Sequence, residues 1–126
     1  MLVLDSGGLS RLSQRTRRAA ALVEALRAVG LWPPVVPTVV LAESTSGSAR
    51  TDANINRLLK ACDVDPLVPA VAARRAGYLR ARARRGSAVD ALLVAIAEPG
   101  GTILTGDSDD LEALAAYSNG VMIERA

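Results

Sequence analysis

Short, continuous apolar runs recur along the chain, separated by longer stretches in which apolar residues have helical spacing. Such runs, bounded by Gly, Pro or Asp, are typical of strands buried in a sheet. The predicted strands are residues 1–4, 35–36, 102–105 and 121–123, and residues 64–68 are a weaker candidate that Pro66 interrupts. Strands that alternate with helices indicate βαβ units and a mostly parallel sheet.

Apolar residues at intervals of three and four predict the helices between these strands. The clearest helix begins near Thr16 and ends at Gly30, with residues such as Leu22 and Leu26 on its apolar face. Further helices are predicted from Leu9, from Thr38, and over residues 52–61, 70–85, 87–98 and 111–117. A chain of 126 residues suffices for one core. The predicted fold class is therefore α/β, a single domain over residues 1–126 with a small, mostly parallel sheet flanked by helices.

Composition restricts both the core and the chemistry. Hydrophobic residues make up 50% of the chain but aromatic residues only 2%, so Ala, Val, Leu and Ile must build the core. Cys62 is the only cysteine and there is no histidine, which excludes an internal disulfide, a structural zinc site and any nucleophile that histidine activates. If the protein is an enzyme, carboxylates, hydroxyls and arginines must perform its chemistry.

Two features of the chain bear on its location. The longest uncharged stretch, residues 28–42, contains three prolines and does not predict a membrane span. The N-terminus has no basic segment before its apolar run and meets Asp5 at once, unlike a signal peptide. We therefore expect a cytoplasmic protein without a membrane partner.

Acidic residues follow two of the predicted strands. Asp5 comes directly after residues 1–4, and Asp107, Asp109 and Asp110 follow the strand 102–105. Parallel strands end at the same edge of a sheet, where open α/β folds bind ligands. One acid there can cap a helix, but three exceed that need, and their mutual repulsion favours a bound cation. A hard divalent cation is the natural candidate.

Two more acids lie on predicted apolar helices. Glu43 follows Val-Val-Leu-Ala and, taken alone, fits the solvent boundary of its helix. Asp90 stands three residues after Ser87 in a capping-box pattern, yet the helix that follows it is apolar all round and therefore predicted to be buried. Each acid alone is explained by a structural role; together they point to a site.

Fourteen of the fifteen basic residues are arginines, and six of those lie between Arg74 and Arg85. A solvated helix face is the usual explanation for such a run. However, no Asp or Glu lies within this segment to pair with the arginines, and Arg is well shaped for phosphate. The cluster therefore favours a polyanionic partner.

Four segments contain the acids in a recognisable order: M-L-V-L-D-S-G-G-L, P-T-V-V-L-A-E, S-A-V-D-A-L-L-V-A-I-A and T-I-L-T-G-D-S-D-D-L. Together they resemble the PIN-domain family, and more narrowly the VapC-type toxins of bacterial toxin–antitoxin systems. The resemblance implies a parallel sheet flanked by helices and acids that bind Mg²⁺ or Mn²⁺ for RNA cleavage. By position, the residues that match the acidic quartet are Asp5, Glu43, Asp90 and Asp107, and Asp109 matches an auxiliary acidic position.

The resemblance also implies the remaining parts of the machinery. Ser6 and Thr105 become candidate hydroxyls that hold the carboxylates, although turn bonding would explain both. Because the segment from Arg74 to Arg85 contains no acidic partner, its residues Arg80, Arg82 and Arg84 are the predicted contacts to that RNA. The implied partners are RNA, a second copy of the chain, and an antitoxin whose segment occupies the acidic cleft and contributes an arginine.

Three functions compete on this basis. The leading one is a metal-dependent endoribonuclease that acts as the toxin of a two-component system. The second is a catalytically silent module of the same fold that binds RNA or regulates. The third is a receiver-type phosphotransfer domain, which expects a lysine near its phosphorylated Asp, whereas Lys60 is the only lysine in the chain.

Overall fold

The computed structural model describes all 126 residues and contains five strands and seven helices in the predicted alternation. The strands are β1 (Leu2–Leu4), β2 (Val35–Pro37), β3 (Asp63–Asp65), β4 (Thr102–Thr105) and β5 (Met122–Arg125). The helices are α1 (Ser6–Ser13), α2 (Arg17–Ala28), α3 (Thr38–Ser44), α4 (Ala53–Leu59), α5 (Ala70–Ala83), α6 (Ala88–Ala97) and α7 (Asp109–Ala115).

All five strands pair in parallel in the order β3-β2-β1-β4-β5. At the centre of the sheet, Val3 of β1 lies opposite Val35 of β2 and Ile103 of β4. The chain builds outward from β1 to β3 and then crosses back to β4, so the strand order reverses between β1 and β4. Open α/β sheets bind ligands beyond the carboxyl ends of the strands at such a point. The predicted fold class is confirmed.

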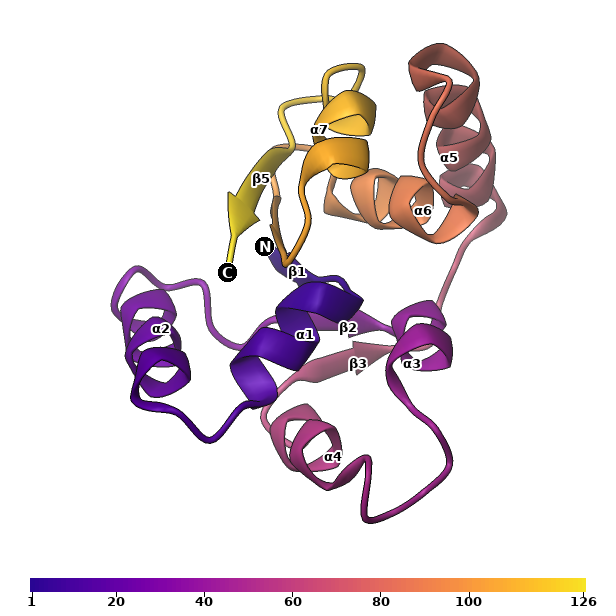
Figure 1. Ribbon diagram of the computed structural model, residues 1–126. Coiled ribbons are helices and arrows are strands. Elements are labelled where there is room, and N and C mark those ends of the chain that lie inside the picture. The colour runs from indigo at the N-terminus through magenta and orange to yellow at the C-terminus, as the bar shows by residue number, and fades with distance from the viewer.

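The helices form two groups, α1–α4 and α5–α7, on the two sides of the sheet (Figure 1). Helix α1 contacts α2, α3 and α4, whereas α6 lies between α5 and α7. Right-handed crossovers produce this division, because the chain moves one way along the sheet before β3 and the other way after it. No helix is both long enough and apolar enough to cross a membrane.

The core consists only of Leu, Val, Ile and Ala side chains, as the composition predicts. Helix α6 lies at its centre, with Ala91, Leu93, Val94 and Ala97 buried. Each fully buried Leu or Val contributes about 1.5–3 kcal/mol relative to an exposed one, so α6 is held firmly against the sheet. Its first turn, which includes Asp90, is therefore fixed relative to the strand ends.

Several predicted boundaries differ in the structure: α1 begins at Ser6 and not at Leu9, α7 at Asp109 and not at Leu111, and β5 spans Met122–Arg125 and not 121–123. At two further boundaries a single residue gives the reason. The third strand is Asp63–Asp65 and not 64–68, because Pro66 has no N–H for a ladder bond and the Asp65 carboxylate accepts a hydrogen bond from the Leu67 N–H (2.9 Å) to form a turn. Helix α5 ends at Ala83 and not at Arg85, because Arg84 adopts a left-handed conformation (φ 56°, ψ 28°).

Candidate acidic site

A cavity of about 280 Å³ opens at the carboxyl ends of β1 and β4. No hydrophobic residue lines it; the lining residues are Asp5, Ser6, Gly7, Asp90, Gly106, Asp107 and Asp110. Four carboxylates from β1, α6 and the β4–α7 segment thus share one space. Three of them belong to the predicted quartet, and the fold brings them together from positions far apart in the sequence.

Asp5 is the most constrained of these acids. It caps α1, with Oδ1 accepting a hydrogen bond from the Gly8 N–H (2.6 Å), and Oδ2 is bonded to the Thr105 hydroxyl. Burial raises the pKa of Asp5 above its usual value, the hydrogen bonds from Thr105 and Gly8 lower it, and the charge of Asp90 raises it again. The net result is a raised pKa, because desolvation outweighs the hydrogen bonds.

Thr105 ties the ends of β1 and β4 together. Its side chain is fully buried, and its hydroxyl accepts a hydrogen bond from the Asp107 N–H (3.1 Å). The single hydroxyl proton is donated either to Asp5 or to the Asp107 carbonyl, whose oxygen lies 2.9 Å away. Thr105 is thus in a position to orient the Asp5 carboxylate. Ser6 lines the cavity and bonds to none of the carboxylates.

The two glycines after Ser6 allow α1 to begin against β4. A Cβ atom on Gly7 would lie 2.6 Å from the Gly106 nitrogen, and one on Gly8 would overlap the Leu104 carbonyl. Only glycine permits so close an approach of two backbones. The Gly-Gly pair therefore holds the Asp5 carboxylate within reach of Thr105.

Asp90 has the capping role that its spacing predicts. Its N–H donates to Ser87 Oγ (3.0 Å), and its Oδ2 accepts from the Ser87 N–H (3.1 Å). Its Oδ1 forms no hydrogen bond within the protein, and the same side chain lines the cavity. One carboxylate therefore both fixes the start of α6 and forms part of the acidic cavity.

The three acids after β4 diverge. Asp107 is exposed at the cavity, and its Oδ1 accepts a hydrogen bond from the Asp109 N–H (3.3 Å). The Asp109 carboxylate instead lies 3.5 Å from Arg125 Nη2 and does not line the cavity. Asp110 lines it and is bonded to Arg85 Nε (2.7 Å).

Asp110 is absent from the sequence-predicted site, although helical phase could have identified it. Leu111 and Leu114 are the buried residues of α7. At 100° per residue, Asp109 lies on the side opposite these leucines and Asp110 lies beside them. The residue that reaches the cavity is therefore the one next to the buried face.

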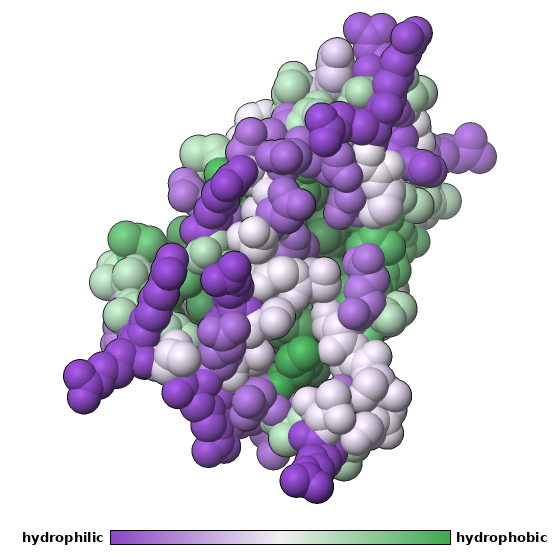
Figure 2. All heavy atoms as spheres, viewed as in Figure 1, coloured by the Kyte–Doolittle hydropathy of each residue, from purple (hydrophilic) through white to green (hydrophobic).

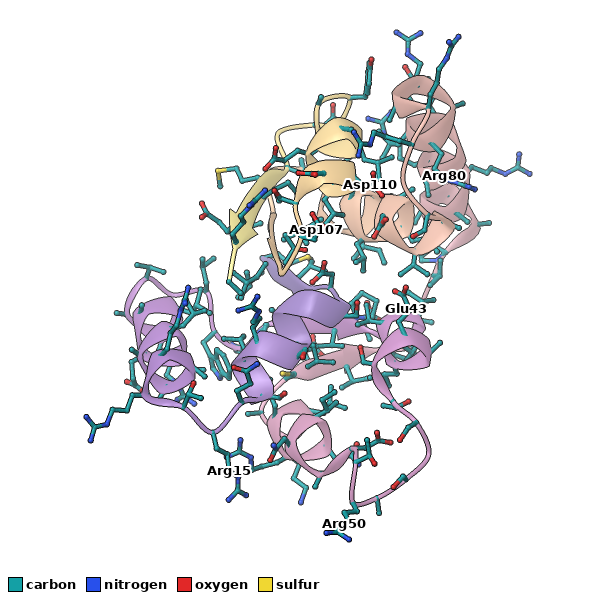
Figure 3. The ribbon with its side chains drawn as sticks, in the orientation of Figure 1. Arg15, Glu43, Arg50, Arg80, Asp107 and Asp110 are labelled. Carbon is teal, nitrogen blue, oxygen red and sulfur yellow. The ribbon has the colours of Figure 1, made fainter.

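Glu43 is exposed on α3 and is not among the residues that line the cavity; Figure 3 shows it apart from Asp107 and Asp110. No three metal-ligating side chains converge on one point. The cavity nevertheless suits a hydrated hard cation, because its donors are all oxygens and Mg²⁺ keeps several waters while using one or two carboxylates. At roughly 30 Å³ per water, about 280 Å³ has room for such an ion.

The arginines of α5 and of the two residues after it point in different directions. Arg80, Arg84 and Arg85 line a second pocket of about 470 Å³, whereas the Arg82 guanidinium lies 5.5 Å from the ring centre of Tyr117. Helical phase separates Arg80 from Arg82, because positions two residues apart lie nearly opposite each other on α5. The positive charge is also partly compensated from other elements: Arg75 pairs with Glu98 (2.9 Å) and Arg85 with Asp110.

No protein family model and no curated protein sequence matches the chain. Among solved structures it is similar to a crystal structure of VapBC2 from Rickettsia felis bound to a DNA fragment from their promoter, with a TM-score of 0.69. The chain has a PIN-like fold. The alignment covers 99% of this chain and 98% of the other, at 12% sequence identity, so the likeness is one of fold and agrees with the resemblance of the sequence motifs.

Proposed function

We propose that this protein is a metal-dependent endoribonuclease, the toxin of a toxin–antitoxin pair, that cleaves phosphodiester bonds in RNA. The main support is the oxygen-only cavity in which Asp5, Asp90, Asp107 and Asp110 meet at the carboxyl ends of β1 and β4. The fold shared with the VapBC2 structure adds support, as does the motif resemblance.

In this proposal Asp5, Asp90 and Asp107 hold Mg²⁺ or Mn²⁺, with Glu43 and Asp109 as further acids that the resemblance assigns. The ion, when bound, supplies an activated water and stabilises negative charge on the leaving oxygen. Thr105 and the Gly8 N–H orient Asp5, and the capping box orients Asp90. Because the pKa of Asp5 is raised, protons compete with the cation there, and cation affinity should increase as the pH rises through that pKa.

The decisive experiment is RNA cleavage with Mg²⁺ or Mn²⁺ and with a chelator. Asp90→Asn and Asp107→Asn should each abolish the metal-dependent products. Glu112→Gln is the matched control, since Glu112 is an exposed acid of α7 outside the cavity. The single variants Asp109→Asn and Asp110→Asn, compared in the same assay, show which acid cleavage requires: Asp109, which the resemblance assigns, or Asp110, which lines the cavity.

A catalytically silent, RNA-binding module is the second candidate. Two observations favour it: Glu43 lies outside the cavity, and no three ligating side chains converge. That protein would bind RNA equally with metal or chelator and release no products. Cleavage that is lost in Asp107→Asn but retained in Glu112→Gln would exclude it.

Association with an antitoxin and with a second copy completes the proposal. Exposed apolar side chains at and before the start of α5, Leu67 (69% exposed) and Val71 (75%), support self-association. A groove of about 690 Å³ between α1, α2 and α4 has an apolar floor that includes Leu12 and Leu58, and arginines lie along it. An acidic amphipathic partner segment suits such a groove, and a following arginine of the partner would suit the acidic cavity.

A further inference from the structure

The end of α5 gathers three arginines in one pocket. The left-handed conformation of Arg84 (φ 56°) reverses the chain after Ala83, so that Arg85 and Gly86 return beside Arg80, whose Nε donates to the Gly86 carbonyl (3.4 Å). The pocket holds about 470 Å³, and its lining is Gly77, Arg80, Ala81, Arg84, Arg85 and Gly86. No carboxylate lines it. Strongly hydrophilic side chains gather over this end of the molecule, around α5 and α7 (Figure 2).

Two of these arginines are unpaired and the third is shared. Arg80 and Arg84 form no ion pair with any acid of the chain, whereas Arg85 Nε lies 2.7 Å from Asp110 Oδ1. Asp110 is also a wall of the acidic cavity. The basic pocket and the acidic cavity therefore share the Arg85–Asp110 pair as a common wall, and Figure 3 shows Asp110 between Asp107 and Arg80.

The Arg85–Asp110 ion pair is weak enough for Arg85 to exchange Asp110 for another anion. Its side chains are 53% and 48% exposed, and Arg85 contacts Asp110 through Nε alone. Half-exposed pairs joined by one hydrogen bond are weak. A phosphate between Arg80, Arg84 and Arg85 would meet three guanidinium groups, each able to bond two oxygens.

We propose that the basic pocket binds a backbone phosphate of the RNA strand, and that Arg85 leaves Asp110 for this phosphate when the strand binds. The identity of the ligand as RNA rests on the proposed function. Departure of Arg85 adds an uncompensated carboxylate to the acidic cavity, which increases its affinity for a divalent cation. Strand and cation therefore assist each other's binding, since such coupling is reciprocal.

The pocket is tested by binding of a short single-stranded RNA in the presence of a chelator, so that no cleavage occurs. Arg80→Gln and Arg84→Gln should each weaken binding and make the plot of log affinity against log salt less steep, by at most about 0.7, because the pocket holds one phosphate. Arg50→Gln removes the same charge from an exposed arginine that lines neither the pocket nor the acidic cavity and lies at the other end of the molecule from Arg80 (Figure 3), so it should leave the slope unaltered. Equal slopes for Arg50→Gln and Arg84→Gln overturn the pocket.

The exchange is tested by removing its competitor. Asp110→Asn should tighten RNA binding roughly two- to fivefold, and the gain should vanish when Arg85→Gln is also present. Glu112→Gln removes the same charge two residues away, from an exposed acid of α7 outside the cavity, and should change binding little. Equal tightening by Glu112→Gln and Asp110→Asn would mean a general field effect and overturn the exchange.

Two further comparisons identify the phosphate and separate this inference from the nuclease. RNAs with and without a 5′-phosphate should bind alike; strict dependence on the 5′-phosphate overturns the assignment to the strand backbone. If the protein cleaves RNA and the Arg80→Gln and Arg84→Gln variants bind RNA as the native protein does, the phosphate pocket is refuted but the nuclease proposal is not. If RNA binding depends on these arginines but no RNA is cleaved, the nuclease proposal is refuted but the pocket is not.

Discussion

Thr105→Val removes one hydroxyl from beneath the acidic cavity and leaves the shape of the side chain nearly unchanged. The hydroxyl is fully buried and is bonded to the Asp5 carboxylate and the Asp107 N–H. If Thr105 holds Asp5 in place, the substitution should reduce stability and weaken divalent-cation binding together, because the same hydroxyl serves both.

The size of the loss follows from the two bonds. A hydrogen bond to a charged group contributes about 1.5–3 kcal/mol, but Asp5 is only partly buried and Asp107 is exposed, so water replaces part of what is lost. We expect a loss of about 2 kcal/mol. For a two-state domain of 126 residues this corresponds to a decrease in Tm of roughly 8 °C.

The strand supplies its own controls. Thr102 is a second buried threonine of β4, and its hydroxyl bonds to no carboxylate, so Thr102→Val should change Tm little. Thr105→Ser keeps the hydroxyl and should retain most of the cation-induced rise in Tm. Thermal melts of the three variants with and without Mn²⁺ measure both effects. Equal losses in Thr102→Val and Thr105→Val would refute the special role of Thr105.

The loss should also depend on pH. Burial raises the pKa of Asp5 in the folded protein above its value in the unfolded chain. The folded protein therefore loses stability as the pH rises from the unfolded pKa through the folded pKa, because Asp5 ionises less readily when it is buried. The Thr105 bond stabilises the ionised form and reduces this cost. Thr105→Val should therefore be most harmful above the Asp5 pKa and less harmful as the pH falls through it. A loss that is the same at neutral and acidic pH would contradict this assignment.

Four further outcomes are expected. Divalent cation at ten times its Kd should stabilise the native protein by about 1.4 kcal/mol, a few degrees in Tm. Asp90→Asn should reduce this shift, while its amide oxygen still accepts the hydrogen bond from the Ser87 N–H and keeps the metal-free free energy of unfolding within about 1 kcal/mol of native. Gly8→Ala should lower Tm strongly, because its Cβ meets the Leu104 carbonyl, whereas Gly77→Ala, with open space around it, should raise stability by about 0.5–1 kcal/mol. Burial raises the pKa of Cys62 to about 11, so thiol reagents should react slowly at neutral pH and faster only towards that value. Light scattering should detect a dimer at tens of micromolar, about where weak homodimers still associate; a monomer there would contradict self-association.

Local pattern was sufficient for the architecture. Apolar runs bounded by turn residues predicted the strands, and the alternation of strands with helices predicted a parallel sheet, because periodicity and turn chemistry act over a few residues. The same local logic located Asp5 and Asp107 at strand ends, and the Ser87–Asp90 spacing predicted the capping box that the structure contains. The predicted ends of β3 and α5 were wrong, because a single residue, Pro66 after β3 and Arg84 after α5, determines where each element ends.

Tertiary packing decided which acids meet. The sequence could group Asp5, Asp90 and Asp107, but it could not choose Asp110 over Asp109, since that choice depends on which side of α7 packs against the core. Nor could it foresee that Glu43 lies outside the cavity, or that Arg85 reaches Asp110, which is 25 positions further along the chain. Sequence patterns record a residue's preference for helix, strand, core or solvent; the distance between two side chains depends on how whole elements pack, and only the assembled fold determines that.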